Sequence, residues 1–295
     1  MPIKSGLQLT SVRLDKDTYY FLPSDFALEH GRDEAALRKF IKINIFDYKD
    51  GAYLPQTIGF WNILNFAKQY LQSDQEKLSK LYFHNLNHTF HPVRGVIAVA
   101  LKMAIIDGTP PDQDNYECIG LAAALHDIGN IVQRMRHEKI SVDTAKEKLR
   151  ELEYDSKLID CIENCIYSTA IEYNDDVPSR VVGSRDAKLL SDADLSNPGF
   201  FDARYFAMES IKLWLELGNF DLEAYATEGV KFTRQFFEDI GDYHTSVGRF
   251  LFGEQRRNNM KNLEAATLAI LQEADYSMEQ LKRLIELEDE RLLNI

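Results

Sequence analysis

Residues 118–127, CIGLAAALHD, are almost entirely apolar and end in a His–Asp pair. A helix that is apolar on every face belongs in the core of a protein, because none of its sides can face water. Burying an ionisable pair there is costly unless the pair is partnered or binds a metal. As an alternative, His126 and Asp127 could cap the helix beside Gly129. The segment therefore predicts a central buried helix whose end carries either a cap or a polar site.

Apolar residues recur at helical spacing through most of the remaining chain. Residues 8–22 are the exception, since they partly alternate and predict a short strand or hairpin. No repeat, low-complexity segment or linker rich in Pro, Gly or Ser interrupts the chain. Helices are expected over residues 55–71, 88–106, 118–127, 141–153, 156–170, 184–195, 200–217, 221–239 and 259–291. We therefore expect an all-α, multi-helix bundle with a small irregular or β addition at the N-terminus.

A single domain is the expected organisation. The chain has 295 residues, of which 45% are hydrophobic, so it can bury a substantial core. Residues 1–72 are expected to form an N-terminal extension that packs on the core. Residues 73–220 would form the core itself, and the helices of residues 221–295 would complete the same domain.

The charge balance limits the classes of partner. The formal net charge is −13, whereas nucleic acids and anionic membranes are bound by clustered Lys and Arg. Neither partner is therefore expected. A small anionic substrate stays compatible with this charge if a metal or a few local cations receive it.

The cysteines and the hydropathy pattern predict the compartment. Cys118, Cys161 and Cys165 are odd in number, form no Cys-x-x-Cys and fall in apolar segments. Reduced thiols in a cytoplasmic protein are the expected state, with a disulfide or a zinc cage as the alternative. No run of about 18 apolar residues and no N-terminal signal is present. The oligomeric state is left open, and a homodimer is compatible with the sequence.

A second polar signal precedes the apolar helix. The segment LYFHNLNHTFHPV, residues 81–93, holds three of the seven histidines in the chain. A third signal is the SDAD of residues 191–194, on a largely apolar helix. A helical bundle can bring His88, the pair His126 and Asp127, and an aspartate such as Asp192 into one pocket. Two imidazoles and two carboxylates suit a divalent first-row metal with positions left open for water.

This arrangement resembles the HD superfamily of metal-dependent phosphohydrolases, whose pattern is H…HD…D. The pattern is matched by His88, His126, Asp127 and Asp192, and the resemblance covers roughly residues 80–200. Three flanking segments, LHDIGN, HEKISVDTA and LLSDADLSNPG, are similar to the family's own. The resemblance implies an HD-domain bundle that binds one divalent metal ion, which could be Mn, Fe, Co, Ni, Zn or Mg.

The segment FHNLNHT is similar to one HD branch that includes the cyclic-nucleotide phosphodiesterases. The resemblance implies that His88 binds the metal and that His84 is the general acid that protonates the leaving oxygen. The two residues lie one helical turn apart, so both can face one pocket. The metal would activate a water and polarise a phosphoryl oxygen, with Asp127 or Glu138 helping to orient that water.

The expected function is hydrolysis of a phosphate ester, either a monoester or a cyclic diester, of a nucleotide or another small phosphorylated metabolite. Asn85, Lys188 and Arg256 are further candidates for contacts around the metal or with the substrate. Two alternatives are an HD-fold oxygenase or lyase and a metal-binding regulatory protein without turnover. Thr169 stands where dinuclear members of the family carry another histidine, and this favours one ion and hydrolysis.

Overall fold

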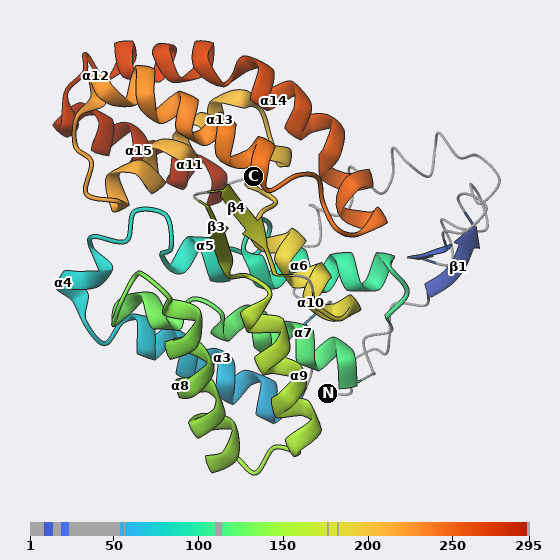
Figure 1. The fold of residues 1–295 in the computed structure, drawn as a ribbon. Helices are drawn as coiled ribbons and strands as arrows, with labels where there is room; N and C mark the ends of the chain where they lie inside the picture. The colour runs from blue at the N-terminus through green and yellow to red at the C-terminus, as the bar shows by residue number, and fades with distance from the viewer. Residues whose placement is uncertain are drawn as a thin grey trace.

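A computed structural model of the chain describes residues 9–13, 19–23, 54–55, 57–109, 114–175, 177–181 and 183–293. Helices dominate the described residues, as the sequence predicts (Figure 1). The α-helices are α3 (Ile58–Leu71), α4 (Gln75–Leu78), α5 (Leu86–Phe90), α6 (Val96–Ile106), α7 (Asp114–Leu125), α8 (His137–Glu151), α9 (Ser156–Tyr167), α10 (Arg185–Asp194), α11 (Ala203–Glu216), α12 (Leu222–Ala224), α13 (Val230–Asp239), α14 (Ser246–Glu273) and α15 (Met278–Leu293). Short 3₁₀ turns η1 (Ile128–Ile131) and η2 (Asn197–Gly199) follow α7 and α10, and a π turn, η3 (Tyr225–Gly229), precedes α13.

The helices form two layers with a third group between them. Figure 1 shows α3, α7, α8 and α9 on one side and α11, α13, α14 and α15 on the other. Between these layers lie α5, α6 and α10, and α10 contacts α6, α7 and α9. Every residue of α7 from Cys118 to Leu125 is buried, so the apolar helix lies in the core as predicted.

Two short antiparallel hairpins accompany the helices. Strands β1 (Leu9–Arg13) and β2 (Tyr19–Pro23) pair with each other, which confirms the predicted hairpin. The other residues of the predicted N-terminal extension before residue 54 lie outside the described residues. The expected packing of that part on the core therefore stays a prediction. Strands β3 (Ile171–Asn174) and β4 (Val177–Arg180) form a second hairpin that the sequence did not predict.

Two predicted helices are each divided in the structure. The helix expected over residues 88–106 becomes α5 and α6, separated by a turn at Pro92. His91 before this proline is extended, with φ −60° and ψ 130°, because a following proline disfavours the helical conformation. The helix expected over residues 259–291 becomes α14 and α15. Asp275 and Tyr276 stand between them with positive φ, which a continuous α-helix does not allow.

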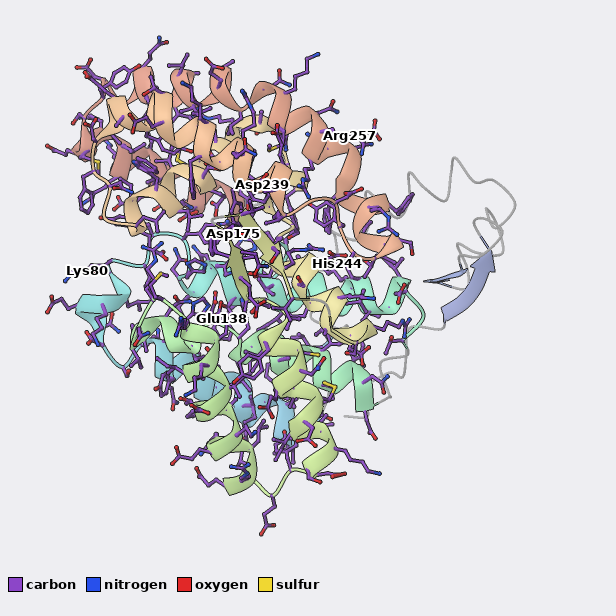
Figure 2. All side chains as sticks on the ribbon, in the orientation of Figure 1. Lys80, Glu138, Asp175, Asp239, His244 and Arg257 are labelled. Carbon is purple, nitrogen blue, oxygen red and sulfur yellow. A yellow bond between two sulfur atoms is a disulfide. The ribbon has the colours of Figure 1, made fainter. Side chains whose placement is uncertain are left out.

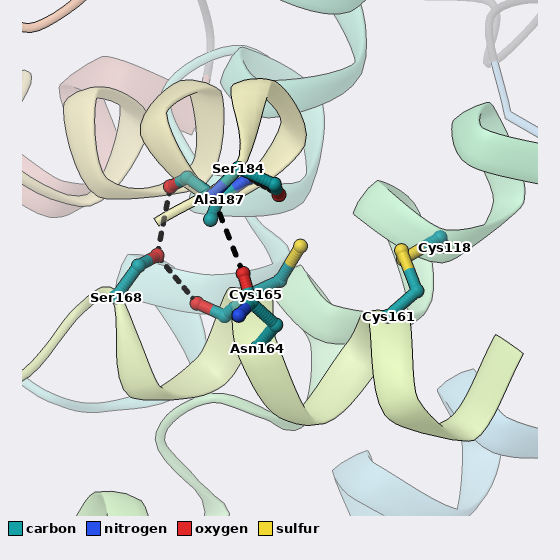
Figure 3. The surroundings of a disulfide bond; sticks show 7 residues. All are labelled: Cys118, Cys161, Asn164, Cys165, Ser168, Ser184 and Ala187. Atoms are coloured by element: carbon teal, nitrogen blue, oxygen red, sulfur yellow. Dashed lines mark hydrogen bonds between the residues drawn. A yellow bond between two sulfur atoms is a disulfide. The ribbon is translucent and has the colours of Figure 1, made fainter. Parts of the chain in front are cut away.

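The prediction of reduced cysteines is wrong for two of the three. Cys118 on α7 and Cys161 on α9 form a disulfide, and Cys165 is a buried free thiol (Figure 3). The pairing depends on the contact between α7 and α9, which residues 43 positions apart do not reveal in sequence.

A buried network of charges joins the last helix to the rest of the fold. Lys212 Nζ on α11 donates to Asp289 Oδ1 on α15 at 2.8 Å, and Arg94 Nη2 donates to the same oxygen at 3.0 Å. Glu209 takes a second bond from Lys212 at 2.8 Å. Opposite charges compensate one another here, as buried charges require.

In the part of the chain that is described, no helix is long and apolar enough to cross a membrane.

Candidate functional site

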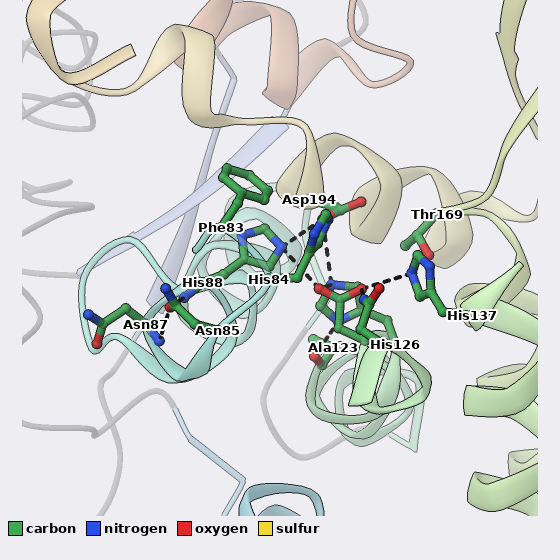
Figure 4. A network of polar contacts seen from close by, with 12 residues as sticks. Phe83, His84, Asn85, Asn87, His88, Ala123, His126, His137, Thr169 and Asp194 are labelled. Atoms are coloured by element: carbon green, nitrogen blue, oxygen red, sulfur yellow. Dashed lines mark hydrogen bonds and ion pairs between the residues drawn. The ribbon is translucent and has the colours of Figure 1, made fainter. Parts of the chain in front are cut away.

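Histidines and aspartates from three separate segments meet at the end of the buried helix (Figure 4). His88 lies in α5, His126 and Asp127 follow α7 directly, and Asp194 is the last residue of α10. One ligand atom each of His88, His126 and Asp194 lie within 4.8 Å of one another. We call these three residues and Asp127 the histidine–aspartate cluster.

The two imidazoles of the cluster face the same two carboxylates. His88 Nε2 lies 3.0 Å from Asp194 Oδ1 and 3.4 Å from Asp127 Oδ2. His126 Nε2 lies 3.5 Å from the same oxygen of Asp194 and 3.2 Å from the same oxygen of Asp127. Two ring nitrogens and two carboxylate oxygens therefore converge on one point.

Local hydrogen bonds orient each histidine. His126 Nδ1 lies 2.8 Å from the carbonyl oxygen of Ala123, and a carbonyl only accepts, so Nδ1 carries the hydrogen. The lone pair of Nε2 then faces the cluster whenever the ring is neutral. Asn85 caps α5, because its Oδ1 accepts bonds from the backbone N–H groups of Asn87 and His88. This cap aims His88 at the cluster.

Gly129 allows the start of α8 to approach Asp127. A Cβ atom at Gly129 would lie 2.2 Å from the carbonyl oxygen of His137, which is far inside contact distance. The Gly129 N–H also donates to Ser141 Oγ at 2.9 Å. The close approach brings His137 Nε2 to 3.0 Å from Asp127 Oδ1. Asn130 Nδ2 donates to the same oxygen at 3.1 Å.

The carboxylates dominate the electrostatics of the site. Burial alone would lower the pKa of His126, but the charges of Asp127 and Asp194 outweigh it and hold that pKa well above its usual value. Burial would raise the pKa of Asp127, and the neighbouring His126 and His84 instead hold it well below its usual range. The pKa of Asp194 is lowered too, against burial, by His126 and His88. The cluster thus attracts positive charge, as protons or as a cation.

Two buried polar atoms of the same site make ion-pair contacts but no hydrogen bond. Among the described residues, His126 Nε2 and Asp127 Oδ2 are both buried and neither takes part in a hydrogen bond. A buried polar group without a partner costs about 1–3 kcal/mol. A divalent cation would satisfy both atoms at once, and a set of imidazole nitrogens and carboxylate oxygens is typical of such sites. The residues therefore fit a metal ion.

His84 stands next to the cluster and is held by a carboxylate from a distant helix. Its Nδ1 donates to Glu216 Oε1 at 2.5 Å, while Glu216 Oε2 accepts the backbone N–H groups of Phe83 and His84 at 2.8 and 3.0 Å. Burial would lower the pKa of His84, but the charges of Glu216 and Asp127 raise it to about 9. This histidine is therefore protonated at neutral pH, and its Nε2 is the free end of the ring.

Asp192 is not in the cluster, contrary to the match made on sequence. Its Oδ1 accepts from Arg180 Nη2 at 2.9 Å and from the His244 N–H at 2.8 Å. Its Oδ2 accepts from the N–H and the hydroxyl of Thr245, both at 2.7 Å. Asp192 thus joins β4 to the start of α14, and Asp194 on the other side of α10 faces the histidines. Two positions along a helix turn a side chain by about 200°, which explains the exchange.

Two further candidates lie elsewhere. Lys188 precedes Asp192 by four residues and so shares its face of α10. Burial and the charge of Arg180 lower the pKa of His244, which precedes α14 (Figure 2), and Lys188 adds to this effect. Arg256 lies over the rings of Phe237 and Tyr243, at 5.4 and 5.3 Å. Arg256 therefore belongs to the packing between α13 and α14, and neither cation is part of the histidine–aspartate cluster.

Glu138 lies at the edge of the site. Its Oε1 is 3.7 Å from His137 Nε2, so among the described residues it neighbours the histidine that contacts Asp127, and it is not part of the histidine–aspartate cluster. Thr169, at the end of α9, donates its hydroxyl to the carbonyl oxygen of Ile166 at 2.8 Å.

Glu216 and His137 were not among the residues that the sequence assigned to the site. Glu216 lies 132 residues from His84 along the chain, and no spacing rule connects them. The sequence did contain a signal for His137. Gly129, in LHDIGN, and Ser141, in HEKISVDTA, allow the start of α8 to approach Asp127.

Comparison with known proteins gives one match. The family model of the HD domain matches residues 89–195, a segment that contains His126, Asp127 and Asp194 and begins one residue after His88. No curated protein and no solved structure matches the chain. The likeness of FHNLNHT to the phosphodiesterase branch stays a prediction. The helical fold and the His–Asp pair at the end of α7 agree with this match, and residues 89–195 are thus similar to the HD domain.

Proposed function

We propose that the protein is a metal-dependent phosphohydrolase that cleaves a phosphate ester of a nucleotide or another small phosphorylated metabolite. One observation carries the proposal: His88, His126 and Asp194 offer ligand atoms within 4.8 Å of one another, beside the protonated His84. A cation-binding cluster next to a proton donor is the arrangement that ester hydrolysis needs.

Four residues would hold the metal ion, namely His88, His126, Asp127 and Asp194. A divalent ion bound there supplies Lewis-acid chemistry and lowers the pKa of water. Asp127 would offer Oδ2 to the ion, because its Oδ1 is engaged by Asn130 and His137. This engagement fixes the carboxylate and favours one ion over two. Thr169 agrees, since no imidazole stands at that position.

His84 would give the proton to the leaving oxygen. Glu216 holds Nδ1 of the ring, so the proton on Nε2 is the one available for transfer. The two carboxylate oxygens of Glu216 bind the ring and the backbone of the same segment, and the ring is thereby held in one orientation. Glu216 is in this account a positioning residue, which also keeps the donor protonated.

The test combines metal analysis with substrate turnover. The purified protein, first stripped with a chelator, is reloaded with Mn²⁺, Co²⁺, Ni²⁺, Zn²⁺, Fe²⁺ or Mg²⁺ and supplied with phosphate monoesters and cyclic nucleotides. We expect one ion per oxidised chain and metal-dependent release of phosphate or ring opening. Bound redox-active iron with turnover that consumes O₂ would instead indicate an oxygenase. Nucleotide binding without turnover on any substrate would indicate a regulatory protein, and either result would refute the hydrolase.

A further inference from the structure

Three sulfur atoms meet in the core away from the histidine–aspartate cluster (Figure 3). The Sγ atoms of Cys118, Cys161 and Cys165 lie within 4.8 Å of one another. Cys118 precedes His126 by eight residues on the same helix, which is about 12 Å along the helix axis. These sulfurs have no part in the proposed hydrolysis.

We propose that Cys118, Cys161 and Cys165 form a second metal site, for a thiophilic cation such as Zn²⁺, when the Cys118–Cys161 disulfide is reduced. The oxidised chain holds the disulfide and has no such site, so the redox state of two cysteines decides whether the cation binds.

The backbone already places the three side chains for this role. Cys161 and Cys165 are four residues apart on α9 and so share one face of that helix. Cys118 meets that face from α7, which packs on α9. Tetrahedral Zn²⁺ with Zn–S bonds of about 2.3 Å separates its sulfurs by about 3.8 Å. Rotation of the two released side chains is enough to reach this spacing within the present cluster.

Asp186 is a charged neighbour of the sulfur cluster. It stands in the first turn of α10, and its Oδ1 is buried with no hydrogen-bond partner in the described part of the chain. Its charge is close enough to Cys165 to act with burial in raising the pKa of that thiol to about 12. Burial and Asp107 raise the pKa of Asp186, against the effect of Arg185. A cation held by the three sulfurs would compensate part of this buried negative charge.

The exchange balances with a dithiol reductant. A dithiol transfers two electrons and two protons to the disulfide, which yields the Cys118 and Cys161 thiols and the cyclic disulfide of the reductant. The cation then replaces the thiol protons, which pass to solvent, so binding is weaker at low pH. Cys161 is the half-buried member of the three, and it is the sulfur that a reductant reaches.

Co²⁺ is the probe that separates this site from the histidine–aspartate cluster. Thiolate bonded to Co²⁺ gives an intense charge-transfer absorption in the near ultraviolet, and imidazole and carboxylate ligands do not. Titration of the reduced protein should develop this band at one Co²⁺ per chain beyond the histidine site. The band should persist in His126→Ala and be absent from the oxidised protein. In Cys165→Ser, which leaves the disulfide pair intact, its intensity should fall by a third or more.

Thiol alkylation gives the second readout and uses the wild-type chain. In the reduced protein, Zn²⁺ should slow alkylation of all three cysteines at least tenfold, and a chelator should reverse this protection. The proposal fails if the reduced, folded protein shows three alkylatable thiols and no charge-transfer band. It also fails if Cys165→Ser keeps the full band, or if the band disappears in His126→Ala, because the sulfur site would then not be separate or not have three sulfurs.

Discussion

Replacing Glu216 by glutamine should lower the pKa of His84. The structure holds that pKa at about 9 against a usual value of 6.5, and Glu216 raises it both through its charge and through its hydrogen bond. An opposite charge in direct contact shifts a pKa by about 1–3 units, and each unit corresponds to about 1.4 kcal/mol. In Glu216→Gln we therefore expect the pKa of His84 to fall by at least about one unit.

The same change alters the pH dependence of stability. A histidine whose pKa is raised by folding contributes stability that is fully present below pH 6.5 and is lost as the pH rises through about 9. His126 and His137, whose pKa values are also raised, contribute a similar loss in both proteins. The difference between wild type and Glu216→Gln therefore reports the pair of His84 and Glu216, and it should reach about 1.4 kcal/mol or more between these pH values.

Histidine ring resonances of the chelator-treated protein, followed by NMR from pH 5 to about 10, measure the pKa directly. In the active enzyme, the alkaline limb of kcat/KM should move to lower pH in Glu216→Gln, while metal content stays the same. Glu209→Gln is the matched control, because Glu209 is a buried carboxylate on α11 that pairs with Arg94 and Lys212 instead. An unchanged His84 titration in Glu216→Gln, or a wild-type pKa already near 6.5, would refute the reasoning.

Three further predictions follow from the contacts described above. Asp194→Asn should lose metal. Asp192→Asn should keep metal and lower the free energy of unfolding by about 3–5 kcal/mol, since it removes one partner of a buried ion pair. Metal analysis and urea unfolding of both variants test this, and metal loss only in Asp192→Asn would show that Asp192 is the ligand. His84→Ala should keep its metal and hydrolyse substrates about 10² to 10⁴ times more slowly. The loss should be smaller on nitrophenyl esters, whose leaving group needs no proton. Equal losses on all substrates would exclude the acid role. Reducing the disulfide of Cys118 and Cys161 in metal-free protein should lower the free energy of unfolding by up to about 4 kcal/mol, from the 43-residue separation that it closes, and an unchanged urea midpoint would contradict this.

Local patterns were sufficient for much of the fold and for part of the site. The apolar residues before His126 predict a buried helix that ends in a polar pair, since such a helix has no face for water. His84 and His88 both lie at the site, as predicted, but the reason differs: α5 begins only at Leu86, so His84 precedes the helix and does not share a helical turn with His88. Gly129, in LHDIGN, leaves room for the start of α8, and its N–H binds Ser141, in HEKISVDTA, so that α8 approaches Asp127.

The tertiary structure alone decided which partners these residues meet. A helical period predicts that Asp192 and Asp194 point about 200° apart, but it does not say which of them faces the histidines. That choice depends on how α10 is rotated between α6 and α14, where Arg180 and Thr245 receive Asp192. Glu216 reaches His84 only because α11 folds back over α5. These contacts join residues 12, 53 and 132 positions apart, and they are set by the packing of whole helices, which no local pattern encodes.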